Sequence, residues 1–386
     1  MSKAGISETS GSRKVRDKTR QILWAKAAGR CQYSNCNRLL IGDLISGNRD
    51  INAALVAHII AGDKNGPRGD DIRSPQLVDD IQNLMLLCYD HHRLIDIDEV
   101  AEHPEDRLLE MKASHERRIE TLGDLTEDQQ THVIRYGAKI GSNESPLSFE
   151  NVRTVVLPDH YPADGRSIGL ELIGCQYEDH EESYWTFQQE NLQRQFRDKI
   201  KGKIETGEIR HLSVFALAPQ PLLIELGRLL CDICPANIHQ LKREPKGWGW
   251  VEDSQPITLL TSEGKHGSKN IALKLALSAT VNDERIHKVL GDDVSVWSIT
   301  VEYPHNDIIR NSDHLVMFRQ RLRKIFDRIK AIHGEDVSIH VFPALPISAA
   351  VEVGRVWMPK ADLPLIIYDQ NTNIGSFIPT LKIKQS

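Results

Sequence analysis

The feature that most constrains this chain is the stretch 83–94, which reads NLMLLCYDHHRL. After an apolar run it places Cys88, His91 and His92 close together, and thiolates and imidazoles are strong metal ligands. Packing alone does not account for three such side chains in so short a segment. The pattern therefore predicts a metal site that residues elsewhere in the chain complete.

Two upstream segments offer further ligands. Cys31 and Cys36 form a thiol pair in a turn-rich segment, and His58 lies in a short apolar run typical of a β-strand. A set of three cysteines and one histidine suits a closed, tetrahedral, structural Zn²⁺, and its members would be Cys31, Cys36, Cys88 and His91. This leaves His58, Asn83 and His92 for an open site that takes a hard catalytic cation.

These residues resemble the HNH, or ββα-metal, endonucleases that carry an embedded zinc knuckle. The family has a cysteine pair, a histidine on the first strand, an asparagine on the second, and Cys-x-x-(Cys/His)-His at the start of a helix. The resemblance implies that His58 is the general base, that His92 is a ligand of the catalytic divalent cation, and that Asn83 binds or orients near it.

The sequence departs from the family pattern at two places. The thiol pair is spaced Cys-x4-Cys rather than the commoner Cys-x2-Cys, and Ala57 stands where many members carry an acidic or histidine metal ligand. The cation would then have fewer protein ligands, with water and phosphate oxygens filling the other positions, an arrangement that Mg²⁺ tolerates.

Phosphodiester hydrolysis needs a base for the attacking water and a cation that neutralises charge on the phosphate and the leaving oxygen. The structural zinc has a different task, because a small module with short strands buries little surface and gains folding free energy from a bound metal. The alternative is a zinc knuckle without catalysis, with His58 buried as a structural residue. We favour catalysis because Asn83 and His92 fall where hydrolysis needs them, while zinc needs neither.

Composition fits an ordinary globular protein. The 386 residues are enough for two or three domains, and the net charge of −6 argues against a protein coated in nucleic acid without excluding a local basic face. There is no run of 18 apolar residues and no apolar signal-peptide core, so we expect a cytoplasmic, bacterial protein without membrane contact. In a reducing compartment the clustered cysteines indicate metal binding rather than disulfides.

The expected organisation is an α+β, zinc-containing HNH domain over residues 1–135, a linker over 136–150, and an α/β domain over 151–386. Residues 1–12 are rich in Ser and Gly and are expected to be disordered. A basic run from Arg13 to Arg20 follows them, and the Gly- and Pro-rich loop 62–70 carries Lys64 and Arg68. The basic run forms either a solvated helix face or, beside a nuclease site, a contact to DNA phosphates, and Lys64 and Arg68 could meet DNA.

The C-terminal half contains a weak internal repeat. Residues 212–221, LSVFALAPQP, precede a helical stretch that reaches Gly227-Arg228, and residues 337–346, VSIHVFPALP, precede another that reaches Gly354-Arg355. Two such strand-turn-helix units imply two Rossmann-like halves, in which ligands bind outside the carboxyl ends of the strands. Helix N-termini there favour phosphate, and a pseudo-dyad suits a ligand with two phosphates and near-twofold symmetry.

This half resembles the SAVED domain, a fused pair of CARF-like units that senses cyclic oligonucleotides. The likeness lies in the two repeat units, in Trp248-Gly-Trp250 and in the segment 366–369. Together the two halves resemble the HNH–SAVED effectors of CBASS anti-phage systems. The resemblance implies that a cyclic di- or trinucleotide, preferably a dinucleotide, drives assembly into a homo-oligomer, a dimer or tetramer, and switches on indiscriminate cleavage of double-stranded DNA that kills the infected cell.

Ligand contacts need aromatic or arginine stacking for bases, and cations or backbone N–H groups for phosphates. The candidates are Gln220, Pro221, Arg228, Trp248, Trp250, Pro346, Arg355 and Tyr368. Two other functions remain open: a nucleotide-sensing adaptor whose zinc module only binds DNA or a partner, and a constitutive, restriction-like HNH nuclease.

Overall fold

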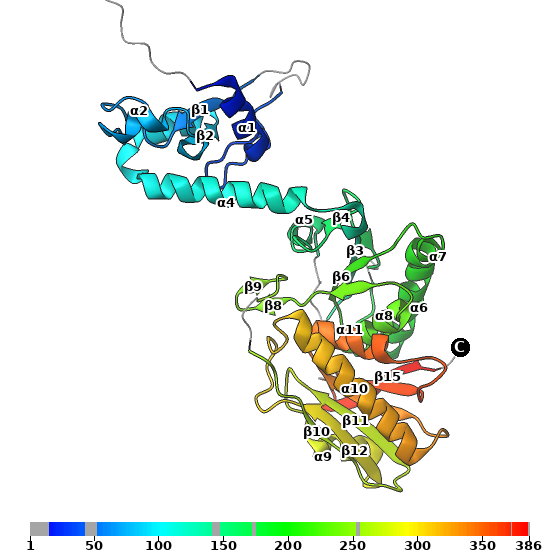
Figure 1. Ribbon diagram of the computed structural model, residues 1–386. Helices are drawn as coiled ribbons and strands as arrows, with labels where there is room; N and C mark the ends of the chain where they lie inside the picture. Colours follow the sequence, from blue (N-terminus) through cyan, green and yellow to red (C-terminus); the bar gives the residue numbers. More distant parts are fainter. Residues whose placement is uncertain are drawn as a thin grey trace, which may run out of the picture. The chain divides into compact units, whose positions relative to one another are not determined.

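The computed structural model describes residues 15–42, 52–140, 147–171, 175–251, 255–371 and 373–384. The chain divides into two compact units, Met1–Leu125 and Thr126–Ser386 (Figure 1). The expected disordered residues 1–12, the first two cations of the basic run and the centre of the expected linker lie outside the described residues. In the described part of the chain, no helix has both the length and the apolar character that crossing a membrane would require.

The division between the units lies earlier than the expected linker over 136–150. Strand β3 (Gln130–Gly137) pairs in parallel with β6 (Leu212–Leu217), so it belongs to the sheet of the second unit. The expected boundary after residue 135 was therefore wrong, because the chain has already entered the second unit when β3 begins.

The first unit is built on a short antiparallel hairpin followed by a helix. Strand β1 (Leu55–His58) pairs with β2 (Leu84–Leu87), with His58 opposite Leu84, and α3 (Tyr89–Arg93) follows directly. The remaining elements are α1 (Asp17–Ala27), α2 (Arg73–Leu77), η1 (Ile81–Asn83), η2 (Leu94–Asp98), η3 (Val100–Glu102) and α4 (Glu105–Gly123). The ββα order expected from the sequence is confirmed.

The core of the first unit forms around β2. All four residues of this strand are buried, and they pack with Leu23 of α1 and Leu108 of α4. A buried polar bridge joins the segment of the cysteine pair to the same core. The amide oxygen of Gln32 accepts a hydrogen bond from Leu86 N at 2.7 Å, and its nitrogen donates to Glu116 of α4 at 3.4 Å. The segment that carries Cys31 is thereby fixed to β2 and α4.

The second unit begins with a sheet whose pairings are all parallel among the described residues. Its order is β4-β3-β6-β7, and β5 also pairs with β3. The new strands are β4 (Tyr161–Pro162), β5 (Ile168–Gly169) and β7 (Ala236–Ile238). The helices of this part are α5 (Phe149–Val152), α6 (Glu182–Phe196), η5 (Arg197–Lys201), α7 (Gly202–Glu205) and α8 (Gln220–Leu230), with the short 3₁₀ turn η4 (Glu127–Gln129) before β3.

A second sheet of six strands completes this unit, in the order β10-β12-β11-β13-β14-β15. Its strands are β10 (Leu260–Ser262), β11 (Asn270–Ala276), β12 (Val294–Thr300), β13 (Ile339–Ala344), β14 (Leu365–Asn371) and β15 (Ser376–Ile383). The four central strands are parallel, and both edge strands are antiparallel to their neighbours. The helices are α9 (Asp283–Leu290), α10 (Ser312–His333) and α11 (Ile347–Val356), and β8 (Lys242–Arg243) and β9 (Lys246–Gly247) form a small hairpin.

The internal repeat corresponds to β6 followed by α8 and β13 followed by α11, and its two glycines mark a close crossing of these helices. A Cβ atom on Gly354 would lie 1.9 Å from the carbonyl oxygen of Ile224, and one on Gly227 would lie 1.9 Å from that of Val351. Only glycine allows the two backbones to approach this closely. The repeated glycine therefore encodes helix packing between the two sheets.

One half-buried carboxyl of β14 predicts how stability depends on pH. Burial raises the pKa of Asp369 from 3.8 to about 7, and Asp179 acts in the same direction. The folded state then keeps a proton that the unfolded chain has lost, so stability should fall as pH rises from about 4 to about 7. We expect Asp369→Asn to flatten this decline and to raise the melting temperature at pH 8 by a few degrees in thermal scans. The same substitution at the exposed Asp336 is the control, and a pH profile unchanged by Asp369→Asn would contradict the prediction.

Candidate functional site

His58 lies at the end of β1 with one ring nitrogen anchored. Its Nε2 is 2.9 Å from the carbonyl oxygen of Val78, and because a carbonyl only accepts, Nε2 carries the proton. The other nitrogen, Nδ1, has no hydrogen-bond partner among the described residues. The imidazole is half-buried. A neutral histidine held in this way presents a basic nitrogen to an incoming water, as the predicted general base requires.

Asn83 directly precedes β2, where Leu84 pairs with His58, and its side-chain amide is hydrogen-bonded to backbone groups. Its Oδ1 accepts from Ile60 N at 2.8 Å, and its Nδ2 donates to Ile60 O at 2.9 Å and to Leu77 O at 3.2 Å. The side chain is buried. These contacts fix the residues that follow His58, so they support the orienting role and not the expected role as a cation ligand.

His92 lies on α3 and has an acidic partner that sequence reasoning missed. Its Nε2 is 3.7 Å from Oδ2 of Asp96, one helical turn further on, and both side chains are partly exposed. Imidazole and carboxylate are a donor pair that Mn²⁺ and related divalent cations accept, so the residues present fit the expected cation. The signal in the sequence was the spacing of four residues, which places two side chains on one helix face.

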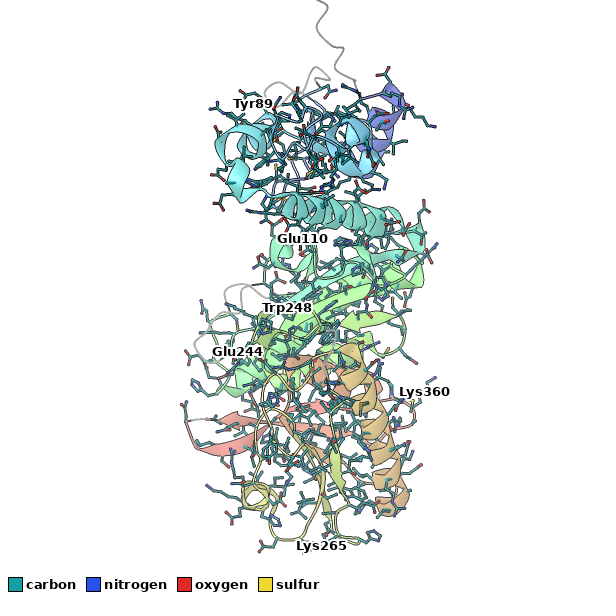
Figure 2. The ribbon with its side chains drawn as sticks, turned by 60° about the vertical axis from the view of Figure 1, so that its left-hand side comes forward. Tyr89, Glu110, Glu244, Trp248, Lys265 and Lys360 are labelled. Atoms are coloured by element: carbon teal, nitrogen blue, oxygen red, sulfur yellow. The ribbon has the colours of Figure 1, made fainter. Side chains whose placement is uncertain are left out.

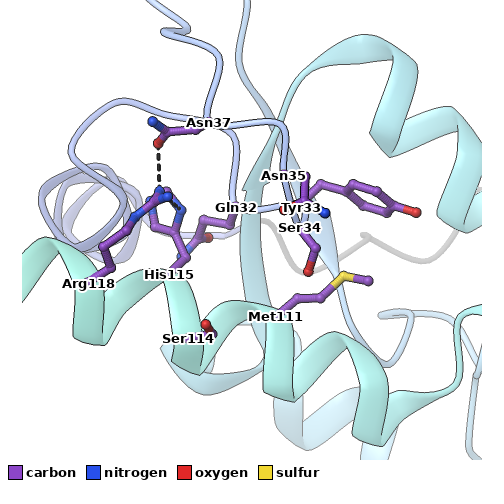
Figure 3. Close-up of a pocket in the computed structure, with 9 residues that line it drawn as sticks. All are labelled: Gln32, Tyr33, Ser34, Asn35, Asn37, Met111, Ser114, His115 and Arg118. Atoms are coloured by element: carbon purple, nitrogen blue, oxygen red, sulfur yellow. Dashed lines mark hydrogen bonds between the residues drawn. The ribbon is translucent and has the colours of Figure 1, made fainter. Parts of the chain in front are cut away.

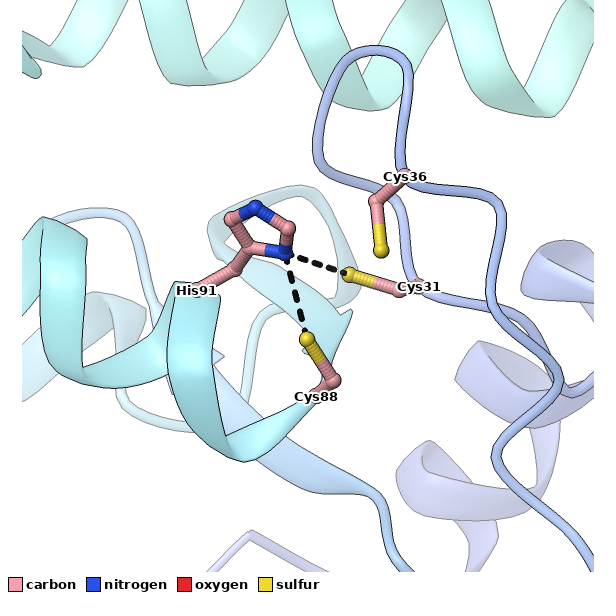
Figure 4. A group of neighbouring side chains, drawn as sticks. All are labelled: Cys31, Cys36, Cys88 and His91. Atoms are coloured by element: carbon pink, nitrogen blue, oxygen red, sulfur yellow. Dashed lines mark hydrogen bonds between the residues drawn. The ribbon is translucent and has the colours of Figure 1, made fainter. Parts of the chain in front are cut away.

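The four expected zinc ligands come together (Figure 4). The ligand atoms of Cys31, Cys36, Cys88 and His91 all lie within 4.8 Å of one another. Nδ1 of His91 is 3.1 Å from Sγ of Cys88 and 3.7 Å from Sγ of Cys31. Ligand atoms around a tetrahedral Zn²⁺ are separated by about 3.5 to 4 Å, so this donor set fits a structural zinc ion.

The unusual spacing of the thiol pair is accommodated by a tight loop. Asn35 and Asn37 adopt positive φ angles of 66° and 50°, a conformation that asparagine tolerates better than most residues. The ring of Tyr33 stacks on His91 at 4.0 Å between centroids. Burial raises the pKa of the Cys31 thiol to about 12. Because of the tight loop, the longer Cys-x4-Cys spacing brings both thiols to the cluster, as the commoner Cys-x2-Cys spacing would.

A pocket lies beside the loop that carries Cys31 and Cys36, and the residues that line it hold this loop in place (Figure 3). It is formed by residues 32–37 and one face of α4. Arg118 of α4 donates to Oδ1 of Asn37 at 2.6 Å and lies 3.1 Å from Nδ1 of His115, whose Nε2 is 3.1 Å from Ala27 O. Because its cation is already bonded to the loop, we interpret this pocket as a brace for the zinc cluster.

Removing one zinc ligand should remove the metal. We expect Cys88→Ser to abolish stoichiometric zinc and to lower the melting temperature of the first unit, because metal binding contributes directly to the folding of small zinc modules. Metal content by mass spectrometry and thermal unfolding test this. Cys234→Ser, at a buried cysteine of the second unit, should keep its zinc. Full zinc content in Cys88→Ser would disprove the ligand set.

In the described part of the chain, three of these cations have acidic partners within the protein. Arg16 pairs with Asp79, and Lys64 lies 3.1 Å from Asp71. The side chain of Arg68 is only 9% exposed and bonds to neighbouring backbone and to Asp96. The position of Arg68 gives no support to the contact with DNA that its loop suggested, because its guanidinium points into the fold.

In the second unit, the starts of α8 and α11 converge. The side chain of Gln220, at the start of α8, accepts a hydrogen bond from Leu345 N at 3.0 Å. Beside it, Gln240 accepts from Ser348 N at 3.1 Å and from Ser348 Oγ at 2.7 Å. Pro221 and Pro346 flank the same helix starts. Three of the expected ligand residues, Gln220, Pro221 and Pro346, thus lie at these helix starts, where the parallel strands end.

An aromatic cluster lies against the start of α11 (Trp248 is labelled in Figure 2). His239 stacks on Phe215 at 4.2 Å and on Trp250 at 6.2 Å, and Trp248 meets Phe215 edge-on at 5.2 Å. Ile347 of α11 packs against this cluster. Burial lowers the pKa of His239 to about 3, and both of its ring nitrogens are buried without a partner in the described part of the chain. Sequence reasoning missed this histidine.

The other expected ligand residues lie elsewhere. Arg228 and Arg355 bond to the buried Glu225 and Glu352, each three residues earlier in the same helix. Tyr368 stacks on Phe342 at 4.5 Å in a separate buried cluster. Their predicted contacts with a ligand therefore find no support in these positions.

Comparison with known proteins agrees with this division. A family model for HNH endonucleases matches residues 43–100, and a model for the SMODS-associated and fused to various effectors sensor domain, SAVED, matches residues 192–383. The chain joins an HNH endonuclease domain to a SAVED domain. No curated protein sequence matches it.

Solved structures that match this chain include Cap4 SAVED/CARF-domain receptors. One, from Acinetobacter baumannii with the cyclic trinucleotide 2′3′3′-cAAA, is 13% identical, with a TM-score of 0.44 over 82% of this chain and 67% of that one. A second, from Moraxella osloensis, is 11% identical, with a TM-score of 0.38 over 72% of this chain and 54% of that one. The HNH–SAVED chain thus spans between half and two thirds of these receptors.

Proposed function

We propose that this protein is a metal-dependent DNA endonuclease that a cyclic oligonucleotide activates in CBASS anti-phage defence. The observation that carries the proposal is the ββα site. There His58, anchored through its ring nitrogen, and the partly exposed His92 lie on adjoining elements. The presence of a SAVED domain in the same chain supports control of that site by a nucleotide signal.

In the proposed reaction, His58 accepts a proton from the attacking water through Nδ1, while the bond from Nε2 to Val78 keeps the ring oriented. Asn83 holds the backbone after His58 and so limits movement of the base. His92 would hold Mg²⁺ or a similar divalent cation, which when bound neutralises charge on the phosphate and the leaving oxygen. Cys31, Cys36, Cys88 and His91 would hold zinc and keep the module folded.

The proposed nucleotide site lies where α8 and α11 begin. The dipole at a helix N-terminus favours phosphate, and the two helix starts are joined through Gln220 and Leu345. The adjoining Trp250 is partly exposed and offers an aromatic face for a base, while Trp248 is buried in the cluster beside it. A cyclic di- or trinucleotide fits this pairing, and the two parallel-sheet halves would act as CARF-like units related by a pseudo-dyad.

Activation is proposed to occur through assembly. One ββα site engages one DNA strand at a time, so two sites in a dimer or tetramer could cut both strands of a duplex. The nucleotide must then bind the assembled state better than the free protomer. Light scattering with and without nucleotide tests this step, and activated cleavage without a change in mass would contradict it.

The proposal as a whole is tested by incubating plasmid DNA and Mg²⁺ with the protein and a panel of cyclic di- and trinucleotides. We expect degradation with at least one member and intact plasmid without nucleotide. Both results are required of a nuclease that works in the bacterial cytoplasm and stays inactive until a nucleotide signal is present. Plasmid that stays intact with every member would favour the adaptor, and cutting without nucleotide would favour a constitutive nuclease.

A further inference from the structure

Arg68 occupies an unusual position between two elements of the nuclease site. Its guanidinium donates from Nε to Ile59 O at 2.5 Å, from Nη1 to Ile95 O at 2.8 Å and from Nη2 to Oδ1 of Asp96 at 2.6 Å. The backbone of Arg68 has a positive φ of 56°, which arginine rarely adopts. The inward-pointing side chain and the uncommon backbone conformation thus occur at the same residue.

These bonds join the strand of the base to the helix of the cation ligand. Ile59 directly follows His58 in the chain, and Ile95 and Asp96 belong to η2, which continues from α3 and His92. A planar guanidinium with several fixed donors can hold all three acceptors at once, whereas an ammonium group cannot reproduce this geometry. One side chain thus sets the spacing between the two halves of the site.

Asp96 is left with one oxygen directed toward His92. Oδ1 is bonded to Arg68, while Oδ2 is 3.7 Å from Nε2 of His92. Two donors that bind one octahedral cation at about 2.1 Å on adjacent positions are about 3 Å apart, so a small side-chain rotation brings this pair to chelating distance. The carboxylate would also supply the acidic ligand that the first strand lacks at Ala57.

We infer that Asp96 is the second protein ligand of the catalytic cation, and that Arg68 is a positioning residue that orients Asp96 and ties it to the strand of His58. The inference rests on the proposed nuclease function and adds a ligand and its support. Outer partners of ligating carboxylates commonly affect metal affinity by roughly 10- to 100-fold. The alternative is that Arg68 and Asp96 form only a structural ion pair.

The test measures Mn²⁺ binding to the full-length, zinc-loaded protein by the electron paramagnetic resonance signal of free Mn²⁺. Asp96→Asn keeps an oxygen acceptor for Arg68 but loses the charge, and we expect its Mn²⁺ affinity to fall by roughly 10- to 100-fold. Arg68→Lys keeps the positive charge but loses the planar guanidinium, and we expect its Mn²⁺ affinity to fall roughly tenfold. Arg73→Lys is the matched control, because this arginine at the start of α2 pairs with Glu105 at the surface, and the Mn²⁺ affinity of the variant should equal that of wild type.

The outcomes separate this inference from the proposed function. A structural ion pair predicts lower melting temperatures with unchanged Mn²⁺ affinity, and that result in Asp96→Asn would overturn the inference, as would a wild type that binds no Mn²⁺. Should Arg68→Lys fail to fold, Asp96→Asn decides alone. Mn²⁺ binding that depends on Asp96, in a protein that cleaves no DNA with any nucleotide, would support the site and sink the proposed function.

Discussion

His58→Ala is expected to reduce nucleotide-activated DNA cleavage by roughly 100- to 10,000-fold, the usual contribution of a positioned general base. The imidazole offers the unpaired Nδ1, and alanine leaves no group that can take the proton of the attacking water. The measurement is the initial rate of plasmid loss at saturating Mg²⁺ and nucleotide. Zinc content and nucleotide binding should stay at wild-type values, because His58 is neither a zinc ligand nor part of the SAVED domain.

His287→Ala is the matched control for this substitution. His287 lies on α9 in the second unit and makes one local contact, from Nδ1 to the carbonyl oxygen of Asp283 at 2.7 Å. Removing it deletes an imidazole without touching the nuclease site, so cleavage should be unchanged. Wild-type cleavage by His58→Ala would remove His58 from the reaction and return it to the structural role that the sequence left open.

Gly354→Ala is expected to destabilise the SAVED domain by about 3 kcal/mol, at the upper end of what overpacking in a core usually costs. The added Cβ would lie 1.9 Å from Ile224 O and 2.5 Å from Arg228 N. Both atoms belong to the backbone of α8, so the clash can be relieved only by separating the helices. The free energy of unfolding from urea titration measures the effect. Gly227→Ala should behave alike, because its Cβ would meet Val351 O at 1.9 Å.

Gly202→Ala provides the comparison for these glycines. Gly202 begins α7, and a Cβ there meets nothing within 4 Å. Since alanine also restricts the unfolded chain, we expect a change between zero and a gain of about 1 kcal/mol. An equal loss of stability at Gly202 and Gly354 would mean that the helix crossing is not the cause.

The zinc cluster and the ββα order could be predicted from the sequence because both depend on local patterns. Thiols and imidazoles have few reasons to cluster other than metal binding, and Cys88 and His91 are one helical turn apart, so their relative position follows from the chain itself. His58 could be predicted for a similar reason, since it ends a short apolar strand of the expected length.

The roles of Asn83 and Arg68 could not be predicted because they depend on where the side chains point. The amide of Asn83 has the chemistry of a cation ligand, but burial directs it to the backbone of Ile60. Arg68, in a Gly- and Pro-rich loop, has the sequence context of a surface cation, and only its buried bonds to Ile59, Ile95 and Asp96 show that it points inward. Tertiary contacts therefore determine the direction and the role of both side chains.

The repeated Gly-Arg pairs show that a correct pattern does not by itself assign roles to its residues. The repeat does mark equivalent strand and helix units, but the glycines serve the helix crossing and the arginines serve buried ion pairs. A glutamate three residues before each arginine was visible in the sequence, at positions 225 and 352. That spacing places the two charges on one helix face and favours an internal pair over a ligand contact.

The central claim is that nucleotide occupancy of the SAVED domain controls the HNH site. The most direct test titrates the activating cyclic nucleotide and measures, in the same samples, the fraction bound and the rate of plasmid cleavage at fixed Mg²⁺. The account predicts a cleavage rate near zero without nucleotide that rises with the bound fraction. Equal rates at zero and full occupancy would contradict it.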